Sequence, residues 1–484
     1  MRMGIAAVIM LDLVIRSNSL IAFYTDDGLL PLSVLYKSNW NPSFFSVYVM
    51  STGWKFISFL FVVNFVLAFL LLIGYRTRLM TILCWFFLIS LHNRNPIILQ
   101  GGDELLRLTL FWGIFLPWGS RYSLDSIRCF PETRSFSGIS VLGYLLLLFS
   151  VYFFSALMKT SSEWRSEGTA LYYALNLDQM TWPLAKWLLQ FPALLRFLTH
   201  YTFYLELLAP FLLFIPYRTN FFRSVFFILI ATLHLAIGMT LFVGLFFIIG
   251  IITLFALVPE KTMDKIELIA KKPRQVALSV FIRLNNALSS FYSIQISRTS
   301  SKLPELLQFQ LGLLKRGFLF FVLCFNLLWC IGNTNISGLK VSGRFQWFAY
   351  LFRFDQDWGM FAPSVYKNDG WYIYEADLES KNNDTSTVKT IDLNRAGATV
   401  NFKKPENILA LYEDDRWRKF GEIWPRQSDR VKKEFCRYLK NKWNRAHPEK
   451  RIGALRIVYM KEVTQPNYAF SLPERTIECD CEKW

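Results

Sequence analysis

Ionisable residues lie within apolar runs of this chain, where they are candidates for chemistry. Asp12 and Arg16 are four residues apart in one apolar run, and Asp103 and Arg107 repeat this spacing in another. Residues at i and i+4 lie on one face of a helix, so each acid can contact its base. Lys159 directly follows a further apolar run. Ionisable groups inside a membrane are costly and usually face a cavity or a partner, so chemistry is expected from such groups.

The motifs of soluble enzymes are missing from the sequence. It contains no P-loop, no dinucleotide-binding glycine fingerprint, no H-E-x-x-H zinc motif and no G-x-S-x-G nucleophile motif. Histidines are few, namely His92, His200, His234 and His447. Three cysteines lie in apolar runs, where a thiol usually only packs: Cys84, Cys324 and Cys330. No metal site is predicted, because the C-x-C pair near the C-terminus falls short of the four ligands of a structural zinc site.

The composition is that of a membrane protein. Of the 484 residues, 53% are hydrophobic and only 18% are charged, whereas a soluble protein carries about 25% charged residues. The apolar residues form runs near the length of about 20 residues that crosses a bilayer. The net charge of +17 is expected to retain loops in the cytoplasm and to attract anionic lipids. Nucleic-acid binding is not favoured, because no basic stripe is interleaved with base-stacking aromatic residues.

The apolar runs predict a multi-pass all-α membrane domain of about nine helices. The predicted spans are 3–23, 56–75, 79–93, 104–118, 137–158, 203–216, 224–241, 243–258 and 317–333. The first span begins almost at Met1, so we expect the natural start to lie upstream, and its charged residues argue against a cleaved signal peptide. The predicted divisions are a membrane domain at 1–258, a basic connecting segment at 259–316, the last span at 317–333 and a separate domain at 334–484.

The positions of Lys and Arg predict the orientation. The segment 259–316 has many basic and few acidic residues, and such loops stay in the cytoplasm. Successive connections lie on alternate sides of the membrane. Counting back from this segment therefore places further basic connections on its side: Arg76 with Arg78, Arg121 with Arg128 and Arg134, and Arg218 with Arg223. The N-terminus is then inside and the C-terminal domain outside. The outer half of the bilayer then contains a set of ionisable residues: Arg16, His92, Arg94, Asp103, Arg107, Lys159, Glu206 and His234.

Such a set predicts a polar chamber that opens toward the exported side. The ordinary alternative for each residue is a structural ion pair. For Lys159 it is a helix-end lysine whose side chain extends to the interface. The gathering of all these residues in one leaflet favours a site over unrelated pairs.

The C-terminal domain is predicted to be α+β. Residues 371–377 and 456–460 alternate as strands with one buried face, and residues 429–439 have helical spacing. Residues 382–387 read as a polar turn between strands. One disulfide is expected on this exported side, with its pairing left open among Cys436, Cys479 and Cys481.

Several segments together carry a family resemblance. The stretch Tyr152–Trp164 resembles the Y-F-x-x-G-x-K-K-x-D-x-D-W segment of vitamin K-dependent gamma-glutamyl carboxylase. Further matches are typical of the wider HTTM (horizontally transferred transmembrane domain) family: Tyr24–Gly28 with Pro31, Gly74–Arg78, Ser90–Pro96, Gly101–Asp103 and Phe115–Gly119. This resemblance covers about residues 1–260. The tail motif Gln356–Pro363 is also similar to one in bacterial members.

The resemblance implies a reaction at the outer face of a bacterial cytoplasmic membrane, with Lys159 in the position of the catalytic base. The carboxylase deprotonates and oxygenates a reduced quinone, here vitamin K hydroquinone or menaquinol. The strong base so formed removes a γ-proton from glutamate, and carbon dioxide adds. A lysine acts as a base only when neutral, which poor hydration and neighbouring cations such as Arg16, Arg94 and Arg107 favour. The other pocket candidates are His92, Asn93, Asp103, Glu163, Trp164, Glu206 and His234. The expected substrate is an exported peptide or protein that contains glutamate.

The sequence also departs from the carboxylase pattern. Met158 stands in place of the first lysine, Ser161 and Glu163 replace the two acids, and a histidine of the segment matching 115–125 has no counterpart. The large lumenal region is replaced by a domain of about 150 residues. Two other functions therefore stay open. One is a non-carboxylating member that assists export or maturation of a secreted peptide, similar to the membrane component of a sporulation-delaying toxin system. The other is a transporter, which the lack of an inverted repeat disfavours.

Overall fold

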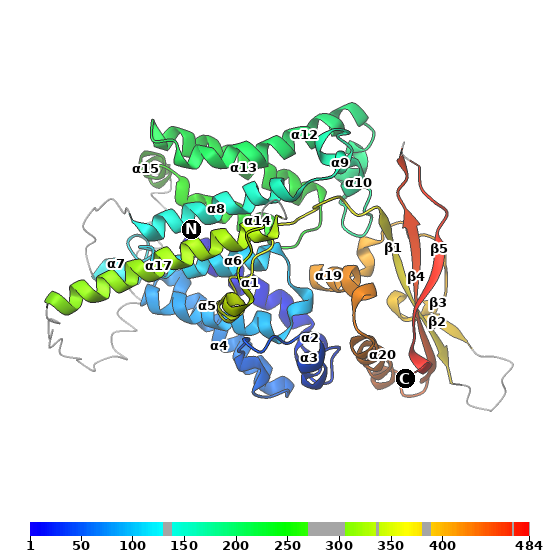
Figure 1. Cartoon of the computed structure of the whole chain (residues 1–484). Helices are drawn as coiled ribbons and strands as arrows, with labels where there is room; N and C mark the ends of the chain where they lie inside the picture. The colour runs from blue at the N-terminus through cyan, green and yellow to red at the C-terminus, as the bar shows by residue number, and fades with distance from the viewer. Residues whose placement is uncertain (129–137, 270–304, 335–337, 380–388, 467–468, 484) are drawn as a thin grey trace.

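A helical part and a sheet-containing part make up the computed structural model, which describes residues 1–128, 138–269, 305–334, 338–379, 389–466 and 469–483 (Figure 1). The helical part begins with α1 (Arg2–Asn18), α2 (Leu20–Tyr24), α3 (Leu32–Ser38), α4 (Trp54–Ile73), α5 (Thr77–Arg94), α6 (Gly101–Gly113) and α7 (Leu124–Arg128). It continues with α8 (Ile139–Met158), α9 (Ser162–Arg165), α10 (Ala170–Leu175), α11 (Pro183–Leu188), α12 (Pro192–Leu208) with η3 (Ala209–Phe214), and α13 (Thr219–Thr240). It ends with α14 (Phe246–Leu254), η4 (Phe255–Leu257), α15 (Glu260–Ile269), α17 (Glu305–Asn333) and α18 (Gly343–Phe352).

Five helices among these residues are long and apolar enough to cross a membrane. They are Trp54–Ile73, Ile139–Met158, Pro192–Phe214, Thr219–Thr240 and Phe309–Asn333. Many of their Phe, Leu, Val and Ile side chains are exposed on the outside of the bundle. Helices satisfy their own backbone hydrogen bonds, so such surfaces can face lipid. The chain is therefore a mostly helical membrane protein.

The count of about nine spans is not confirmed. The other four predicted positions hold helices that are shorter or more polar, namely α1, α5, α6, and α14 with η4. Two of the predicted spans begin well inside the helices that contain them. The span predicted at 203–216 begins at Pro192, because polar residues in the first turns of α12 conceal its start from a hydropathy pattern. The span predicted at 317–333 belongs to a helix that begins at Glu305, and residues 270–304 of the predicted connecting segment lie outside the described residues.

Three of the connections predicted to share a side are in contact. Gly74 has a left-handed backbone (φ 72°), and a Cβ there would clash with Arg2 and Ser123. Asp125 accepts hydrogen bonds from the backbone N–H groups of Arg76 and Thr77. Further along, Arg121 pairs with Glu260 at 3.0 Å and with Asp264 at 3.6 Å. These connections lie at the end of the helical part away from the sheet (Figure 1). The face of the membrane on which they lie stays a prediction.

The C-terminal part is built on a five-stranded sheet in the order β3-β2-β1-β4-β5. Its strands are β1 (Asn368–Leu378), β2 (Thr390–Asp392), β3 (Ala398–Thr399), β4 (Ile452–Val463) and β5 (Glu474–Asp480), and all neighbours are antiparallel. Two helices, α19 (Asp415–Ile423) and α20 (Asp429–Ala446), lie between the sheet and the helical part (Figure 1). The predicted strands and helix are confirmed, but β1 is buried on both faces rather than on the one face predicted. The turn predicted at 382–387 lies outside the described residues.

Side-chain alternation explains how this sheet packs. Trp371 and Ile373 on β1 join Val458 and Met460 on β4 in one apolar cluster. Tyr374, on the opposite face of β1, contacts Phe435 of α20. Because successive side chains of a strand point to opposite faces, one strand can serve both clusters.

Candidate functional site

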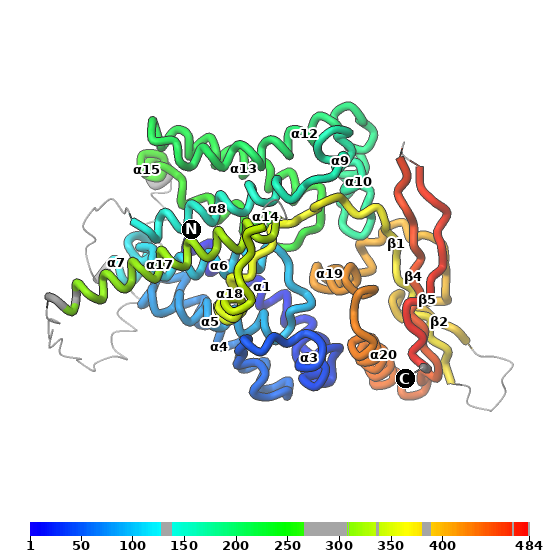
Figure 2. Tube along the Cα trace, viewed as in Figure 1, coloured from blue at the N-terminus to red at the C-terminus, as the bar shows by residue number. Residues whose placement is uncertain are grey.

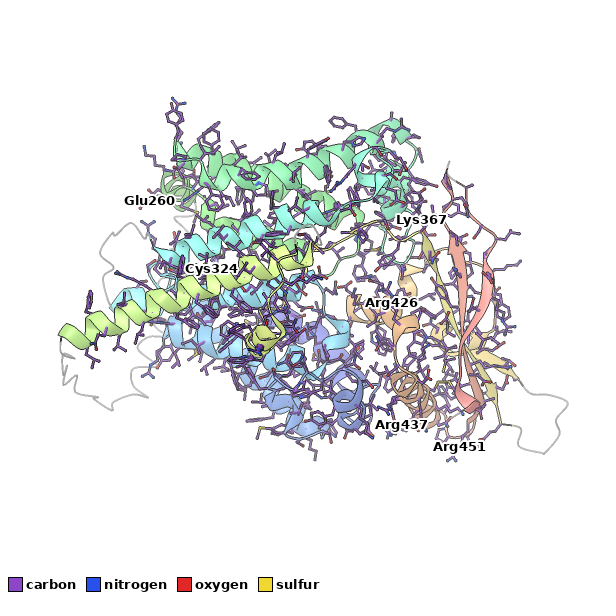
Figure 3. All side chains as sticks on the ribbon, in the orientation of Figure 1. Glu260, Cys324, Lys367, Arg426, Arg437 and Arg451 are labelled. Atoms are coloured by element: carbon purple, nitrogen blue, oxygen red, sulfur yellow. A yellow bond between two sulfur atoms is a disulfide. The ribbon has the colours of Figure 1, made fainter. Side chains whose placement is uncertain are left out.

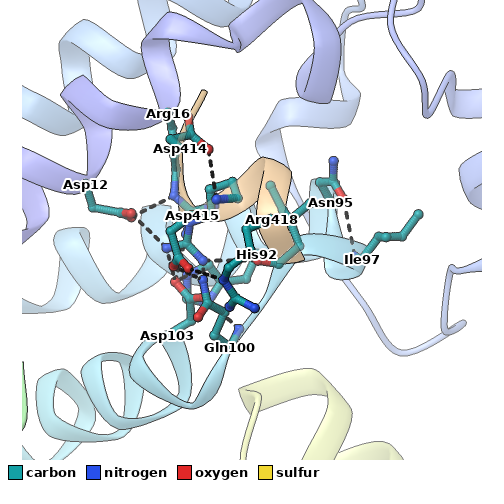
Figure 4. Close-up of polar contacts among 12 residues, drawn as sticks. Asp12, Arg16, His92, Asn95, Ile97, Gln100, Asp103, Asp414, Asp415 and Arg418 are labelled. Atoms are coloured by element: carbon teal, nitrogen blue, oxygen red, sulfur yellow. Dashed lines mark hydrogen bonds and ion pairs between the residues drawn. The ribbon is translucent and has the colours of Figure 1, made fainter. Parts of the chain in front are cut away.

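The first cluster of buried charges joins α1, α5 and α6 (Figure 4). Arg16 donates through Nε to Asp12 and through Nη2 to Asp103, each at 2.7 Å. Its Nη1 donates to the hydroxyl of Tyr24 at 2.8 Å. Asp103 also accepts from the backbone N–H of Gln100, so the same carboxylate caps α6. The predicted pair of Asp12 and Arg16 is therefore present, within a larger network.

A second arginine enters this cluster from the C-terminal domain. Arg416, in the first turn of α19, donates to Asp103 at 2.5 Å and to Asp12 at 2.9 Å. His92 Nε2 lies 3.5 Å from the Asp103 carboxylate. Burial lowers the pKa of Arg416, but Asp103 and Asp12 outweigh burial and raise this pKa well above its ordinary value. Two carboxylates thus balance two guanidinium groups at a buried junction of the two parts.

Sequence reasoning missed Arg416. It lies in a charged segment of a domain predicted to be exposed to water, where one more arginine carries no signal. Only the docking of α19 on the helical part reveals it. The Asp414 side chain caps α19 by accepting from the N–H groups of Arg416 and Trp417. Trp417 donates from Nε1 to Ser19 at 2.8 Å, which holds α19 against α1.

A second cluster forms around Arg107, which does not pair with Asp103 as predicted. Arg107 donates to the backbone carbonyls of Arg353 and Asp355, each at 2.8 Å. Its Nη2 lies 3.6 Å from the Asp355 carboxylate. Arg353 in turn donates to the side chain of Asn93 at 2.7 Å. Arg107 and Asn93 therefore bind the segment that follows α18, whereas Asp103 binds the arginines of the first cluster.

Lys159 forms a third set of contacts at the end of α8. Its Nζ donates to Glu206 of α12 at 2.5 Å and to Ser155 at 2.7 Å. The ring of Trp164 lies 5.0 Å from Nζ, and only 2% of Lys159 is exposed. The neighbour of Lys159 is thus a carboxylate, Glu206, rather than the predicted arginines. Lys159 is also not a helix-end lysine that extends into water, because it is buried.

The other predicted site residues occupy separate positions. Glu163 pairs with Lys367 at 2.6 Å. The Tyr152 hydroxyl contacts His234 Nε2 at 2.8 Å. Arg94 donates to the carbonyl of Leu30 at 3.0 Å. The predicted residues are all buried, as expected, but they divide into several sets rather than lining one chamber.

The tail motif at 356–363 packs against the Lys159 region. Trp164 donates from Nε1 to the carbonyl of Phe361 at 2.9 Å, and the N–H of Ser161 donates to the carbonyl of Pro363 at 3.2 Å. Figure 2 traces this segment in yellow from α18 to β1. Backbone of the C-terminal part therefore covers the turn that follows Lys159.

A small cavity lies at the first cluster. Its lining includes Asp12, Asp103, Arg416, Gln100 and Phe246, and its volume of about 20 Å³ has room for about one water molecule. The charged side chains therefore leave little free volume at the junction.

A further group of acids joins the two parts near β1. Asp369 accepts from the backbone N–H of Asp178 at 2.5 Å, and Lys404 pairs with Asp178 at 2.7 Å and with Glu462. Burial and, second, the Asp178 carboxylate together raise the pKa of Asp369 to about 7. Burial raises the pKa of Tyr412 and of Tyr459, and the charge of Asp369 contributes to both increases.

We expect this group to make stability depend on pH. Asp369 keeps its proton up to about pH 7 in the folded state and loses it near pH 4 when unfolded. The stabilisation therefore falls as pH rises from about 4 through about 7, by about 1 kcal/mol between pH 6 and 8. Unfolding of the purified protein at both pH values measures the change. Asp369→Asn is expected to remove this part of the slope, and an Asn variant with the wild-type slope would show that another group titrates.

Three cysteines lie together where α20 meets the end of β5. Cys436 and Cys481 form a disulfide, and Cys479 Sγ is 3.5 Å from Cys436 Sγ. The side chains of Cys479 and Cys481 share one face because they are two residues apart at the end of a strand. The three sulfur atoms could hold a metal ion by spacing, but the disulfide occupies two of them.

The proximity of the sulfur atoms predicts that Cys436 can form its disulfide with Cys479 when Cys481 is removed. Cys481→Ala is expected to retain one disulfide, now between Cys436 and Cys479, because these atoms are already close. Cys436→Ala is expected to lose it, since it removes the shared partner. Peptide mapping after alkylation without reductant checks both outcomes. Complete alkylation of Cys436 in the Cys481→Ala protein would contradict the expectation.

No protein-family model, curated protein or solved structure matches the chain.

Proposed function

We propose that the chain is a membrane-embedded, quinol-dependent enzyme similar to gamma-glutamyl carboxylase, with the Lys159–Glu206 pair as its base. The observation that carries this proposal is the buried contact between Lys159 and Glu206 at the end of α8. The Glu206 carboxylate can accept the proton of the Lys159 ammonium and leave a neutral amine. An isolated lysine at a helix end lacks such an acceptor. The similarity of Tyr152–Trp164 to the carboxylase segment supports the same assignment.

The surroundings of Lys159 suit a flat ring that carries hydroxyl groups. Trp164 offers an aromatic face beside Nζ. Ser161 Oγ and Glu163 Oε2 are buried, and neither has a hydrogen-bond partner among the residues that the structure describes. Buried polar atoms normally have partners, so a ligand hydroxyl would satisfy them. These residues fit a reduced quinone, such as vitamin K hydroquinone or menaquinol.

In this proposal the residues of the chain handle the proton. Lys159 accepts a proton only when neutral, and Glu206 can first take the lysine proton across their short contact. The neutral pair then takes up a substrate proton and becomes positively charged, which offsets the negative charge left on the substrate. Ser155 accepts from Nζ and holds it in place. A bound reduced quinone would supply the acidic hydroxyl, and its oxidation by oxygen would supply the strong base needed to remove the γ-proton before carbon dioxide adds.

Incorporation of labelled carbon dioxide tests the proposal. Membranes that contain the full-length protein are supplied with oxygen, a glutamate-containing peptide, and vitamin K hydroquinone or menaquinol. We expect incorporation that depends on both quinol and oxygen. If neither quinol supports incorporation, the carboxylase assignment fails, and a role in export or maturation of a secreted peptide becomes the better proposal.

A further inference from the structure

A stripe of cations follows the exposed face of α20. The positions 430, 433, 437 and 445 are separated by three, four and eight residues, so they share one side of the helix. All four side chains are exposed: Arg430, Lys433, Arg437 and Arg445. The opposite face is buried against the sheet and α19 through Val431, Phe435, Cys436 and Leu439. The stripe is therefore not needed to pack α20 in its own domain.

This stripe lies along the helical part. Arg437 donates to the backbone carbonyl of Asp26 at 2.8 Å, and Arg445 lies 3.8 Å from the Asp27 carboxylate. At the start of α20, Ser428 bonds to Ser38 at the end of α3 at 3.3 Å. The cations thus lie beside the turn that follows α2, and the start of α20 lies at the end of α3.

Aromatic residues surround this edge of the helical part. Tyr36 on α3 is 48% exposed, and Trp54, the first residue of the membrane-length helix α4, is 56% exposed. Trp40 contacts Tyr36 edge to face. Lys37 and Lys55 lie next to these aromatic residues in the sequence. Trp and Tyr concentrate at the headgroup level of membranes, so these aromatic residues indicate a membrane surface near α3, which α20 contacts through Ser428.

We propose that α20 binds the phosphate groups of anionic lipids in the leaflet next to the C-terminal domain. Arg430 and Lys433 are exposed, and Glu434, the acid among the stripe cations, already pairs with Arg437 at 2.7 Å. Basic helices beside a membrane attract anionic headgroups. An acidic peptide is the competing occupant, but the aromatic residues at the same level favour lipid. This inference does not rest on the carboxylase proposal.

The test compares two variants with equal loss of charge. Arg430→Gln with Lys433→Gln removes stripe cations and leaves the contacts of Arg437 and Arg445 intact. Lys450→Gln with Arg451→Gln removes two exposed cations beyond the end of α20, and Figure 3 shows Arg451 farther from the helical part than Arg437. Each full-length protein in detergent is titrated with phosphatidylglycerol or phosphatidylcholine, and the thermal unfolding midpoint is recorded.

We expect phosphatidylglycerol, but not phosphatidylcholine, to raise the midpoint of the wild-type and control proteins. The stripe variant should need about 25-fold more phosphatidylglycerol for half of the effect, since each of the two lost cations near a membrane surface contributes about fivefold in affinity. High salt should weaken the wild-type response. An equal response of the stripe and control variants would overturn the proposal. So would a midpoint that responds to a polyglutamate peptide but to neither lipid.

Discussion

Replacement of Lys159 by arginine is expected to leave the protein folded and to abolish quinol-dependent incorporation of carbon dioxide. Arginine can keep the ion pair with Glu206, but its guanidinium stays protonated in proteins and cannot act as a base. General-base catalysis contributes about 100-fold to 10,000-fold, so we expect a loss of about 100-fold or more. Labelled carbon dioxide incorporation and thermal unfolding of the same preparation measure activity and folding together.

A second substitution distinguishes the role of Lys159 as a base from its role in the ion pair. Lys159→Ala leaves the Glu206 carboxylate buried without its partner, which costs about 3–5 kcal/mol when a buried pair is broken. That protein should therefore lose both activity and stability, whereas Lys159→Arg should lose activity alone. If the arginine protein retains wild-type incorporation, Lys159 is not the base and the buried pair is structural.

Arg416→Met is expected to destabilise the whole protein, because it breaks the charged junction between the two parts. The variant leaves Asp12 and Asp103 with Arg16 as their remaining arginine partner in a buried site. Removing one member of such a network costs about 3–5 kcal/mol. Denaturant unfolding of the detergent-solubilised protein, followed by tryptophan fluorescence, measures the loss. Arg430→Met, on the exposed face of α20, is the matched control and should change stability by about 0.5 kcal/mol or less.

A double variant tests whether charge balance is the cause. Asp12→Asn in the Arg416→Met background restores equal numbers of acids and arginines, so the double variant should be more stable than the two single losses predict. Residues in one network couple by about 0.5–3 kcal/mol. If the losses of unfolding free energy in the two single variants simply add in the double variant, Arg416 acts through its packing rather than through its charge.

Most of the architecture follows from patterns that need no knowledge of the fold. Long apolar runs require helices that satisfy their own backbone in lipid, and they predicted the helices that begin at Trp54, Ile139 and Thr219. Alternation in β1 and β4 predicted the strands, because successive side chains of a strand point to opposite faces, although β1 is buried on both faces. The pair of Asp12 and Arg16 was also predictable, since both residues lie on one helix.

The partners of the buried charges were decided by tertiary structure. Lys159 meets Glu206 across a separation of 47 residues, and Arg416 reaches Asp12 across 404. Local spacing holds no information about such contacts, because they depend on how helices pack and on where the C-terminal domain docks. The sequence by itself determined that ionisable residues must find partners inside an apolar protein, because an unpaired buried charge is too costly. Only the packing decided that Glu206 lies against Lys159, and that an arginine from the C-terminal domain completes the cluster around Asp12, Arg16 and Asp103.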